Sequence, residues 1–306
     1  MVSALSALHF HSEEAAFAFV EALIWPEGPT CPHCGGVERI SKMQGKSTRQ
    51  GLYKCYQCRK PFTVKIGTIF EDSKVPMRLW LQAMYLIAGS KKGISSNQLH
   101  RILGVTLKTA WFMSHRIREA MRSNGLDQFG GEGGMVEVDE TFIGREEGRE
   151  VRQSYHHKMK VLSLVDRTTG QARSFVIDSV SVNQIGPIVV ENISREAMLM
   201  TDEHGVYRFL AARFSGGHGV VRHGAHEYVR GEFHTNTIEG FFSIFKRGMK
   251  GVYQHCEKKH LHRYLAEFDF RYSNRVALGY NDSDRADALL TGVVGKRLTY
   301  QTVGAA

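Results

Sequence analysis

The stretch Met135-Val-Glu-Val-Asp-Glu-Thr-Phe-Ile143 has the residue pattern of a β-strand that carries acids into a core. Apolar and polar side chains alternate along it, so Val136 and Val138 face one way, and Glu137, Asp139 and Thr141 face the other. A carboxylate in the interior of a strand is costly to bury unless its charge is compensated. Asp139 is therefore a candidate functional residue.

The segments after this strand predict a layered α/β domain. Residues 160–165 and 173–177 have strand character and are joined by a turn with Gly170. Residues 183–193 read as a helix, and residues 197–202 form a buried strand that ends in Asp202. Consecutive strands, then a helix, a strand and a helix, are typical of a sheet covered by helices.

A later segment, His234-Thr-Asn-Thr-Ile-Glu-Gly-Phe-Phe-Ser-Ile-Phe-Lys246, predicts a helix with an acid and a base beside its apolar stripe. Thr235 or Asn236 is available as the N-cap. Glu239 and Lys246 lie two turns apart on nearly one line. The stripe has i, i+3, i+4, i+7 spacing and consists of Ile238, Phe241, Phe242 and Phe245.

Asp139, Asp202 and Glu239 together indicate a site for divalent cations, because buried acids need charge compensation. Carboxylate oxygens without converging Cys or His favour Mg(II) or Mn(II) over zinc. Two such ions about 4 Å apart can activate a water or a 3′-hydroxyl on one side of a phosphodiester and stabilise the leaving oxygen on the other. Glu140 and Glu203 adjoin two of these acids. We expect them to point elsewhere and at most to support the metal ligands without binding the ions.

Four of the five cysteines form two pairs, Cys31-Pro-His-Cys34 and Cys55-Tyr-Gln-Cys58, with 20 residues between them (55 − 34 − 1). This is the spacing of a zinc ribbon, and the metal there is expected to be structural. Disulfides and a redox C-x-x-C are the alternatives, and a reducing cytosol argues against the first. Two weaker metal candidates lack a fourth ligand: Cys256 with His260 and His262, and His218 with His223 and His226.

Between the ribbon and the α/β domain, the pattern is that of a helix-turn-helix. Residues 77–88 read as a helix, and residues 97–103 and 107–121 as two more, joined by a turn at Gly104. The last helix would enter a major groove with Lys108 and Arg116 near base edges or phosphates. A plain three-helix bundle with a basic outer face is the alternative.

The overall charge favours a polyanionic partner. Among 306 residues, 40 Lys and Arg outweigh 31 Asp and Glu, which gives a formal charge of +9. No run of about 18 uncharged apolar residues predicts a membrane span, and the first ten residues lack the basic region of a signal peptide. We therefore expect a cytoplasmic protein.

Taken together, the ribbon, the strand at residues 136–141, Thr201-Asp202 and the helix at residues 234–247 resemble those of bacterial insertion-sequence transposases of the DDE class. The resemblance is closest to the group that joins an N-terminal zinc ribbon to a ribonuclease H-like catalytic domain. It implies an α/β fold with a mixed sheet and flanking helices. The expected division is residues 1–70 for the first helix and the ribbon, 71–129 for the helix-turn-helix region, 130–280 for the catalytic domain and 281–306 for a C-terminal tail.

The resemblance also implies roles for individual residues. Asp139 would bridge two ions, and Asp202 and Glu239 would each hold one. The sequence has 62 residues between the first two acids (202 − 139 − 1) and 36 between the last two (239 − 202 − 1). Lys246 would contact DNA near the cleaved phosphate. The other DNA-binding residues expected are Lys108, Arg116, His234, Asn236 and Arg247.

By this resemblance, the protein would bind the terminal inverted repeats of a mobile element, cleave them with metal ions and join the 3′-hydroxyl to target DNA. We expect it to act on double-stranded DNA as a homo-oligomer, in the bacterial cytoplasm at the nucleoid. Two other functions remain open from the sequence. One is a DNA-binding regulator without catalysis, and the other is a ribonuclease H-like nuclease without strand transfer.

Overall fold

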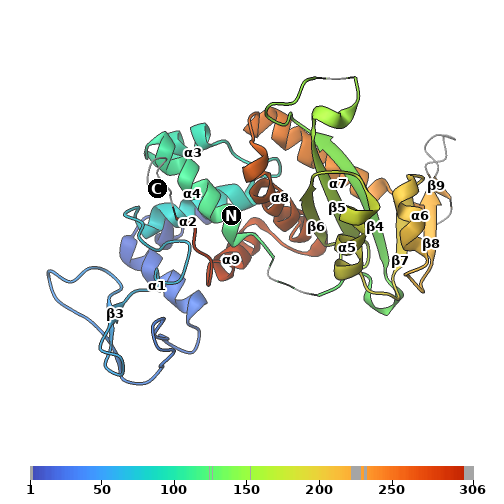
Figure 1. The fold of residues 1–306 in the computed structure, drawn as a ribbon. Helices are drawn as coiled ribbons and strands as arrows, with labels where there is room; N and C mark the ends of the chain where they lie inside the picture. The colour runs from blue at the N-terminus through green and yellow to red at the C-terminus, as the bar shows by residue number, and fades with distance from the viewer. Residues whose placement is uncertain are drawn as a thin grey trace. The chain divides into compact units, whose positions relative to one another are not determined.

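The computed structural model describes residues 3–123, 125, 127–151, 153–221, 229–230 and 233–299. These residues form two compact units, which are drawn with their elements in Figure 1. Unit 1 combines the N-terminal part of the chain, up to Arg122, with the segment from Tyr280 onward. Unit 2 runs from Ser123 to Gly279. In the described part of the chain, no helix is long and apolar enough to cross a membrane.

The first α-helix of unit 1 is α1 (Glu13–Ile24), and Ser12 caps it: the Ser12 hydroxyl accepts the N–H of Ala15 at 3.3 Å. A small antiparallel sheet follows, and Trp25 packs edge-on against Tyr53 and Phe62 above it. The strands, in sheet order, are β1 (Ile40–Lys42), β2 (Tyr53–Cys55) and β3 (Pro61–Phe62). Because so small a core buries little apolar surface, it needs an additional stabilising link.

The helical part of unit 1 consists of α2 (Met77–Gly89), α3 (Ser96–Leu103), α4 (Leu107–Ala120) and α9 (Asp282–Thr291). Helix α3 ends at Gly104, whose φ of 65° is a left-handed conformation that glycine adopts without strain. Thr106 then caps α4 by accepting the N–H of Thr109 at 3.1 Å. The helix, turn and helix expected from the sequence are therefore present.

Helix α9 differs from the expected C-terminal tail. It begins with a capping box at Asn281, and its apolar side packs against α2. Leu289 and Leu290 are buried, at 0% and 1% exposure. Burial of this apolar side is what holds the segment against unit 1.

Unit 2 is built on a mixed five-stranded sheet in the order β6-β5-β4-β7-β8. Strands β4, β5 and β6 are antiparallel, whereas β7 runs parallel to β4 and β8 parallel to β7. The strands are β4 (Met135–Ile143), β5 (Met159–Asp166), β6 (Ala172–Ile177), β7 (Met198–Asp202) and β8 (His218–Val221). A separate pair consists of β9 (Val229–Arg230) and β10 (Phe233–His234).

Helices cover both faces of this sheet. Val136 and Val138 of β4 belong to a core shared with α5 (Val182–Asn192) and α6 (Gly205–Ala211). The opposite face packs against α7 (Asn236–Gly248) and α8 (Lys258–Ser273), and the whole expected stripe of α7 is buried in that core. The predicted fold class, a mixed α/β sheet with flanking helices, is confirmed.

Short helical turns complete the described chain. The 3₁₀ turns are Ala4–Ser6, Leu8–Phe10, Gly131–Gly133, Tyr155–His157 and Val276–Leu278, and a π-helical turn, Met249–Tyr253, follows α7.

A carboxylate on α8 ties this helix to the edge strand β6. Asp269 accepts the N–H of Ser174 at 2.8 Å and its hydroxyl at 2.6 Å. Burial raises the pKa of Asp269 to about 7. An unfolded Asp has a pKa of about 3.9, so between these values the folded state binds a proton that the unfolded state does not.

We predict that Asp269 makes the protein less stable as the pH rises from about 4 to about 7. A carboxyl group whose pKa is raised by folding stabilises the folded state fully when the pH is below the unfolded-state pKa. This contribution is lost as the pH rises through the folded-state pKa. The measurement is thermal unfolding of the wild type and Asp269→Asn at pH 5.5 and pH 8.5. Between pH 5.5 and pH 8.5, the melting temperature of the wild type relative to that of the variant should fall by a few degrees. The same difference in melting temperature at both pH values would contradict the raised pKa of Asp269.

Candidate functional site

The four cysteines of the ribbon come together with the geometry of a tetrahedral metal site. Their sulfur atoms all lie within 4.8 Å of one another. The distance from Cys31 Sγ to Cys58 Sγ is 3.6 Å, and from Cys34 Sγ to Cys55 Sγ it is 3.8 Å. A tetrahedron of sulfurs about 2.3 Å from zinc has edges of about 3.8 Å, whereas a disulfide needs about 2.05 Å. The cluster therefore suits one structural zinc ion.

Backbone N–H groups shape the turns of the ribbon and act on one of its thiols. Gly35 has a φ of +71° and donates its N–H to the carbonyl oxygen of Cys31 at 2.9 Å, which closes the first turn. At the second turn, the backbone N–H groups of Cys58 and Gln57 lower the pKa of the Cys55 thiol to about 7. Such donors favour the thiolate, which is the form that binds zinc.

We predict that the wild-type chain binds one zinc ion per molecule at this cluster. Cys34→Ser should lose the ion and lower the melting temperature, because the small sheet depends on the metal. Cys256→Ser, which changes the fifth cysteine, is the matched control and should keep it. The measurement is elemental analysis of dialysed protein, and a full zinc content in Cys34→Ser would exclude the cluster as the site.

The three acids singled out from the sequence lie on elements that meet in unit 2. Each residue of β7 that pairs with β4 is 63 positions later in the sequence than its partner. Met200, for example, pairs with Glu137 (200 − 137 = 63). The same offset relates Asp139 to Asp202 (202 − 139), so the two aspartates stand at one level of the parallel pair. Glu239 belongs to the first turn of α7, which contacts β4.

The electrostatics of Asp139 show that these acids share one neighbourhood. The pKa of Asp139 is raised to about 8, first by burial and then by the negative charges of Glu140, Asp202 and Glu239. An acid with such a pKa is mostly protonated at neutral pH. Divalent cations would relieve this repulsion, so the donor set fits hard metal ions.

The distances between the three carboxylates limit the number of metal ions that they can bind together. Within the described ranges, the cysteine cluster is the one group of three or more such ligands whose atoms all lie within 4.8 Å. The three carboxylates therefore do not close on a single ion as they stand. Two ions about 3.5–4 Å apart do not require Asp202 and Glu239 to touch, because each acid would hold a different ion.

A hydrogen-bond donor orients each of the three carboxylates. Asp139 Oδ1 accepts the N–H of Glu140 at 2.7 Å, and Asp202 Oδ1 accepts the N–H of His204 at 3.0 Å. Glu239 Oε1 accepts the hydroxyl of Thr235 at 3.0 Å. Donors of this kind fix the direction in which a metal ligand points.

Glu140 points to the opposite face of β4 from Asp139, as expected, because it shares the face of Val136 and Val138 that packs against α6. It accepts a short hydrogen bond from the hydroxyl of Tyr207, which is buried on α6. Burial raises the pKa of Glu140, the bond from Tyr207 opposes this, and the charge of Asp202 adds to it. Glu140 thus belongs to the same charged neighbourhood. Nothing in the sequence marked Tyr207, which reads as an ordinary core residue.

Lys246 lies near Asp139 and near two further lysines. Lys246 is half-buried, and burial lowers its pKa, while the charge of Asp139 acts in the opposite direction. The positive charges of Lys250 and Lys158 lower it further. Lys246 therefore lies close to Asp139.

The remaining predicted residues of unit 2 have different surroundings. Asn236 is exposed at the first position of α7. Arg247 is exposed and donates to the carbonyl and hydroxyl oxygens of Ser243. His234 is half-buried, and its Nδ1 lies 2.6 Å from Arg167 Nη2. The ring of His234 is thus held by Arg167 of the same unit.

In unit 1, the two predicted DNA contacts on α4 have opposite environments. Lys108 is exposed in the first turn. Arg116 is buried, and its Nη1 donates to the carbonyl oxygens of Ile69 and Glu71, at 2.7 Å each, while its Nε donates to that of Leu298 at 3.0 Å. These bonds hold unit 1 together, so the placement of Arg116 contradicts the role in DNA binding expected from the sequence.

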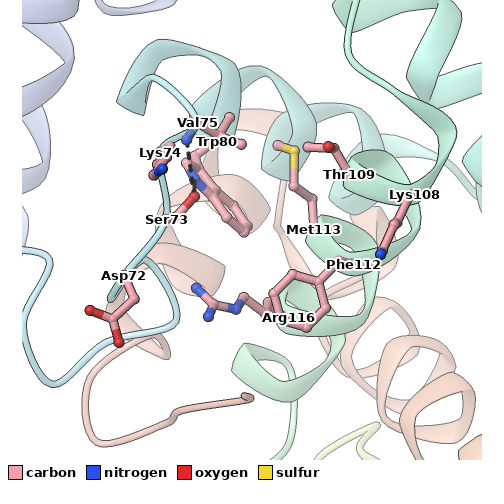
Figure 2. A pocket seen from close by; sticks show the side chains of 10 residues that line it. All are labelled: Asp72, Ser73, Lys74, Val75, Trp80, Lys108, Thr109, Phe112, Met113 and Arg116. Atoms are coloured by element: carbon pink, nitrogen blue, oxygen red, sulfur yellow. Dashed lines mark hydrogen bonds between the residues drawn. The ribbon is translucent and has the colours of Figure 1, made fainter. Parts of the chain in front are cut away.

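A cavity of about 290 Å³ lies beside these residues. Figure 2 shows Arg116 next to the ring of Phe112, with Lys108 farther along α4. The Arg116 guanidinium carbon is 4.6 Å from the centre of the Phe112 ring, a cation–π distance. The apolar walls come from Trp80, Phe112 and Met113.

The weaker metal candidates find no support among the described residues. Cys256, His260 and His262 are not among the groups whose ligand atoms lie within 4.8 Å. His218 Nε2 lies 2.8 Å from the Thr201 hydroxyl oxygen, within hydrogen-bond distance. His223 and His226 lie outside the residues that the structure describes.

Comparison with known families places both units. Residues 132–273 match the ISXO2-like transposase domain, and residues 11–61 match the transposase zinc-ribbon domain. The chain is also similar to the "Uncharacterized protein in transposable element ISH50" of Halobacterium salinarum (strain ATCC 700922 / JCM 11081 / NRC-1). The two are 27% identical over 277 residues, which cover 86% of this chain and 91% of that protein.

A structural comparison gives a much weaker likeness. It relates the chain to one in a structure titled "CryoEM structure of simian T-cell lymphotropic virus intasome in complex with PP2A regulatory subunit B56 gamma". The TM-score is 0.29 and the identity 9%, and the match covers 62% of this chain and 65% of that one, just under two thirds of its length. A likeness of this size carries no argument here.

The mixed sheet, the cysteine cluster and the two matched domains define an insertion-sequence transposase. This chain belongs to the group of these transposases that carries an N-terminal zinc ribbon.

Proposed function

We propose that this transposase cleaves the ends of its element and joins them to target DNA through Asp139, Asp202 and Glu239. The observation that carries the proposal is the placement of the acids: the parallel register of β4 and β7 sets Asp139 and Asp202 at one level, and Glu239 lies in the first turn of α7, which contacts β4. The acids come from three elements far apart in the sequence, and all belong to the part that matches the transposase domain. Acids that repel one another are costly to hold close together, so such a group in a folded protein indicates a functional site.

The residues divide the work between metal binding and phosphate contact. Asp139 would bind both of two Mg(II) or Mn(II) ions, and Asp202 and Glu239 one each. When bound, the ions would supply an activated water or 3′-hydroxyl and charge stabilisation for the leaving oxygen. Lys246, beside Asp139, would hold a non-bridging oxygen of the reacting phosphate.

Binding of the element ends would fall mainly to unit 1. The ribbon exposes Lys46, Arg49, Arg59 and Lys60, and α4 exposes Lys108. Such cations neutralise phosphates and release counterions, which gives affinity without sequence preference. His234, Asn236 and Arg247 would contact DNA beside the acids. Because an element has two ends, at least two copies of the chain would act together.

We predict that Asp139→Asn and Glu239→Gln each reduce cleavage of an element end in Mg(II) by at least about 1,000-fold, because each removes a ligand of the reacting centre. Binding of the same DNA should stay within about threefold. The measurement is the appearance of nicked and joined products on labelled terminal-repeat DNA. The matched control is Glu191→Gln, an exposed carboxylate on α5 that should cleave as the wild type does.

Three outcomes would overturn parts of the proposal. Cleavage by a folded Asp139→Asn protein at the wild-type rate would exclude the acids as the site. Cleavage without joined products would indicate a nuclease. Tight binding by the wild type without any cleavage in Mg(II) or Mn(II) would indicate a DNA-binding regulator.

A further inference from the structure

The amino end of α7 is capped by a carboxylate from β4. Glu137 is fully buried, two residues before Asp139 on the same face of the strand. Its Oε2 accepts the backbone N–H of Ile238 at 2.8 Å. Ile238 is the third residue after the N-cap Thr235, and an N-cap side chain ordinarily accepts this N–H. Glu137 therefore takes over a task that usually falls to the capping residue.

The buried charge of Glu137 is compensated by Arg167, which follows β5. Arg167 Nε donates to Glu137 Oε1 at 2.5 Å. Its Nη2 donates to the carbonyl oxygen of His234 at 2.7 Å, so the same guanidinium holds the segment that leads into α7. The negative charge of Glu137 also suits the positive end of the helix dipole. The start of α7 is thus fixed to both β4 and the end of β5.

Capping by Glu137 leaves the side chain of Thr235 for a different task. Thr235 stands at the N-cap but its side chain makes no capping bond. Its hydroxyl, in a side chain only 1% exposed, donates to Glu239 Oε1 at 3.0 Å. One oxygen of the proposed metal ligand is therefore oriented by a buried donor one turn earlier in the helix.

We propose that Glu137 and Thr235 are positioning residues that together aim the carboxylate of Glu239 at Asp139. Glu137 sets where the helix begins, and Thr235 sets how Glu239 turns. The inference rests on the proposed function, since it assigns a purpose to the orientation of a metal ligand. Groups that orient a ligand in this way typically change metal affinity or activity by about 10–100-fold when removed.

The sharpest test compares Thr235→Val with Thr235→Ser. Valine has nearly the shape of threonine but no hydroxyl, whereas serine keeps the hydroxyl. Thr235→Val should weaken Mn(II) binding by about 10–100-fold, measured by calorimetry on the zinc-loaded full chain without DNA. Thr235→Ser should stay within about threefold of the wild type. Glu239→Gln gives the reference for a lost ligand.

Further measurements separate positioning from a general loss of structure. Thr235→Val should keep the melting temperature within a few degrees and bind terminal-repeat DNA normally, and its cleavage should recover as Mn(II) is raised. Thr291→Val is the matched control, because the hydroxyl of this exposed residue bonds only to the carbonyl of Ala288 in its own helix. Glu137→Gln, which keeps an acceptor for Ile238 but loses the charge facing Arg167, should also weaken Mn(II) binding.

The results for Thr235 test the positioning role, and the results for Glu239 test the proposed function. If Thr235→Val bound Mn(II) as tightly as the wild type, or if Thr235→Ser lost as much affinity as Thr235→Val, the positioning role would be wrong while the three acids remained. If Glu239→Gln bound Mn(II) and cleaved DNA like the wild type, the proposed function itself would fail, and the positioning role with it.

Discussion

The partial burial of Asp139 in the central strand is the constraint on which the rest of unit 2 depends. A carboxylate among apolar residues is destabilising, and here the nearby charges of Glu140, Asp202 and Glu239 increase the cost. The surrounding packing must therefore supply the free energy that holds them together. The two apolar cores on either side of the sheet do so, because they fix β4, β7 and α7 independently of the acids.

The same packing determines which acids lie near one another. The parallel register of β4 and β7 brings Asp139 and Asp202 to one level, and the buried stripe of α7 turns Glu239 toward the same region. Glu137 and Arg167 then fix the start of α7 against the sheet. In unit 1 the corresponding constraint is the cysteine cluster, around which three very short strands are arranged.

Much of this could be predicted from the sequence, because alternation, helical spacing and cysteine spacing are local signals. The strand around Asp139, the stripe of α7 and the ribbon cysteines all follow from such patterns. Arg116 and Glu137 could not be placed in this way, nor could the packing of helix α9 against α2. A buried arginine that bonds to carbonyl oxygens looks in sequence like any exposed arginine, and the partners of Glu137 lie 30 or more positions away.

The central claim is that Asp139, Asp202 and Glu239 hold two metal ions. Anomalous diffraction from crystals grown with Mn(II) tests it most directly, because the signal locates manganese without reference to activity. The account predicts two peaks about 4 Å apart, both against Asp139, with Asp202 beside one and Glu239 beside the other. Manganese bound elsewhere in the chain, with no peak at Asp139, would contradict it.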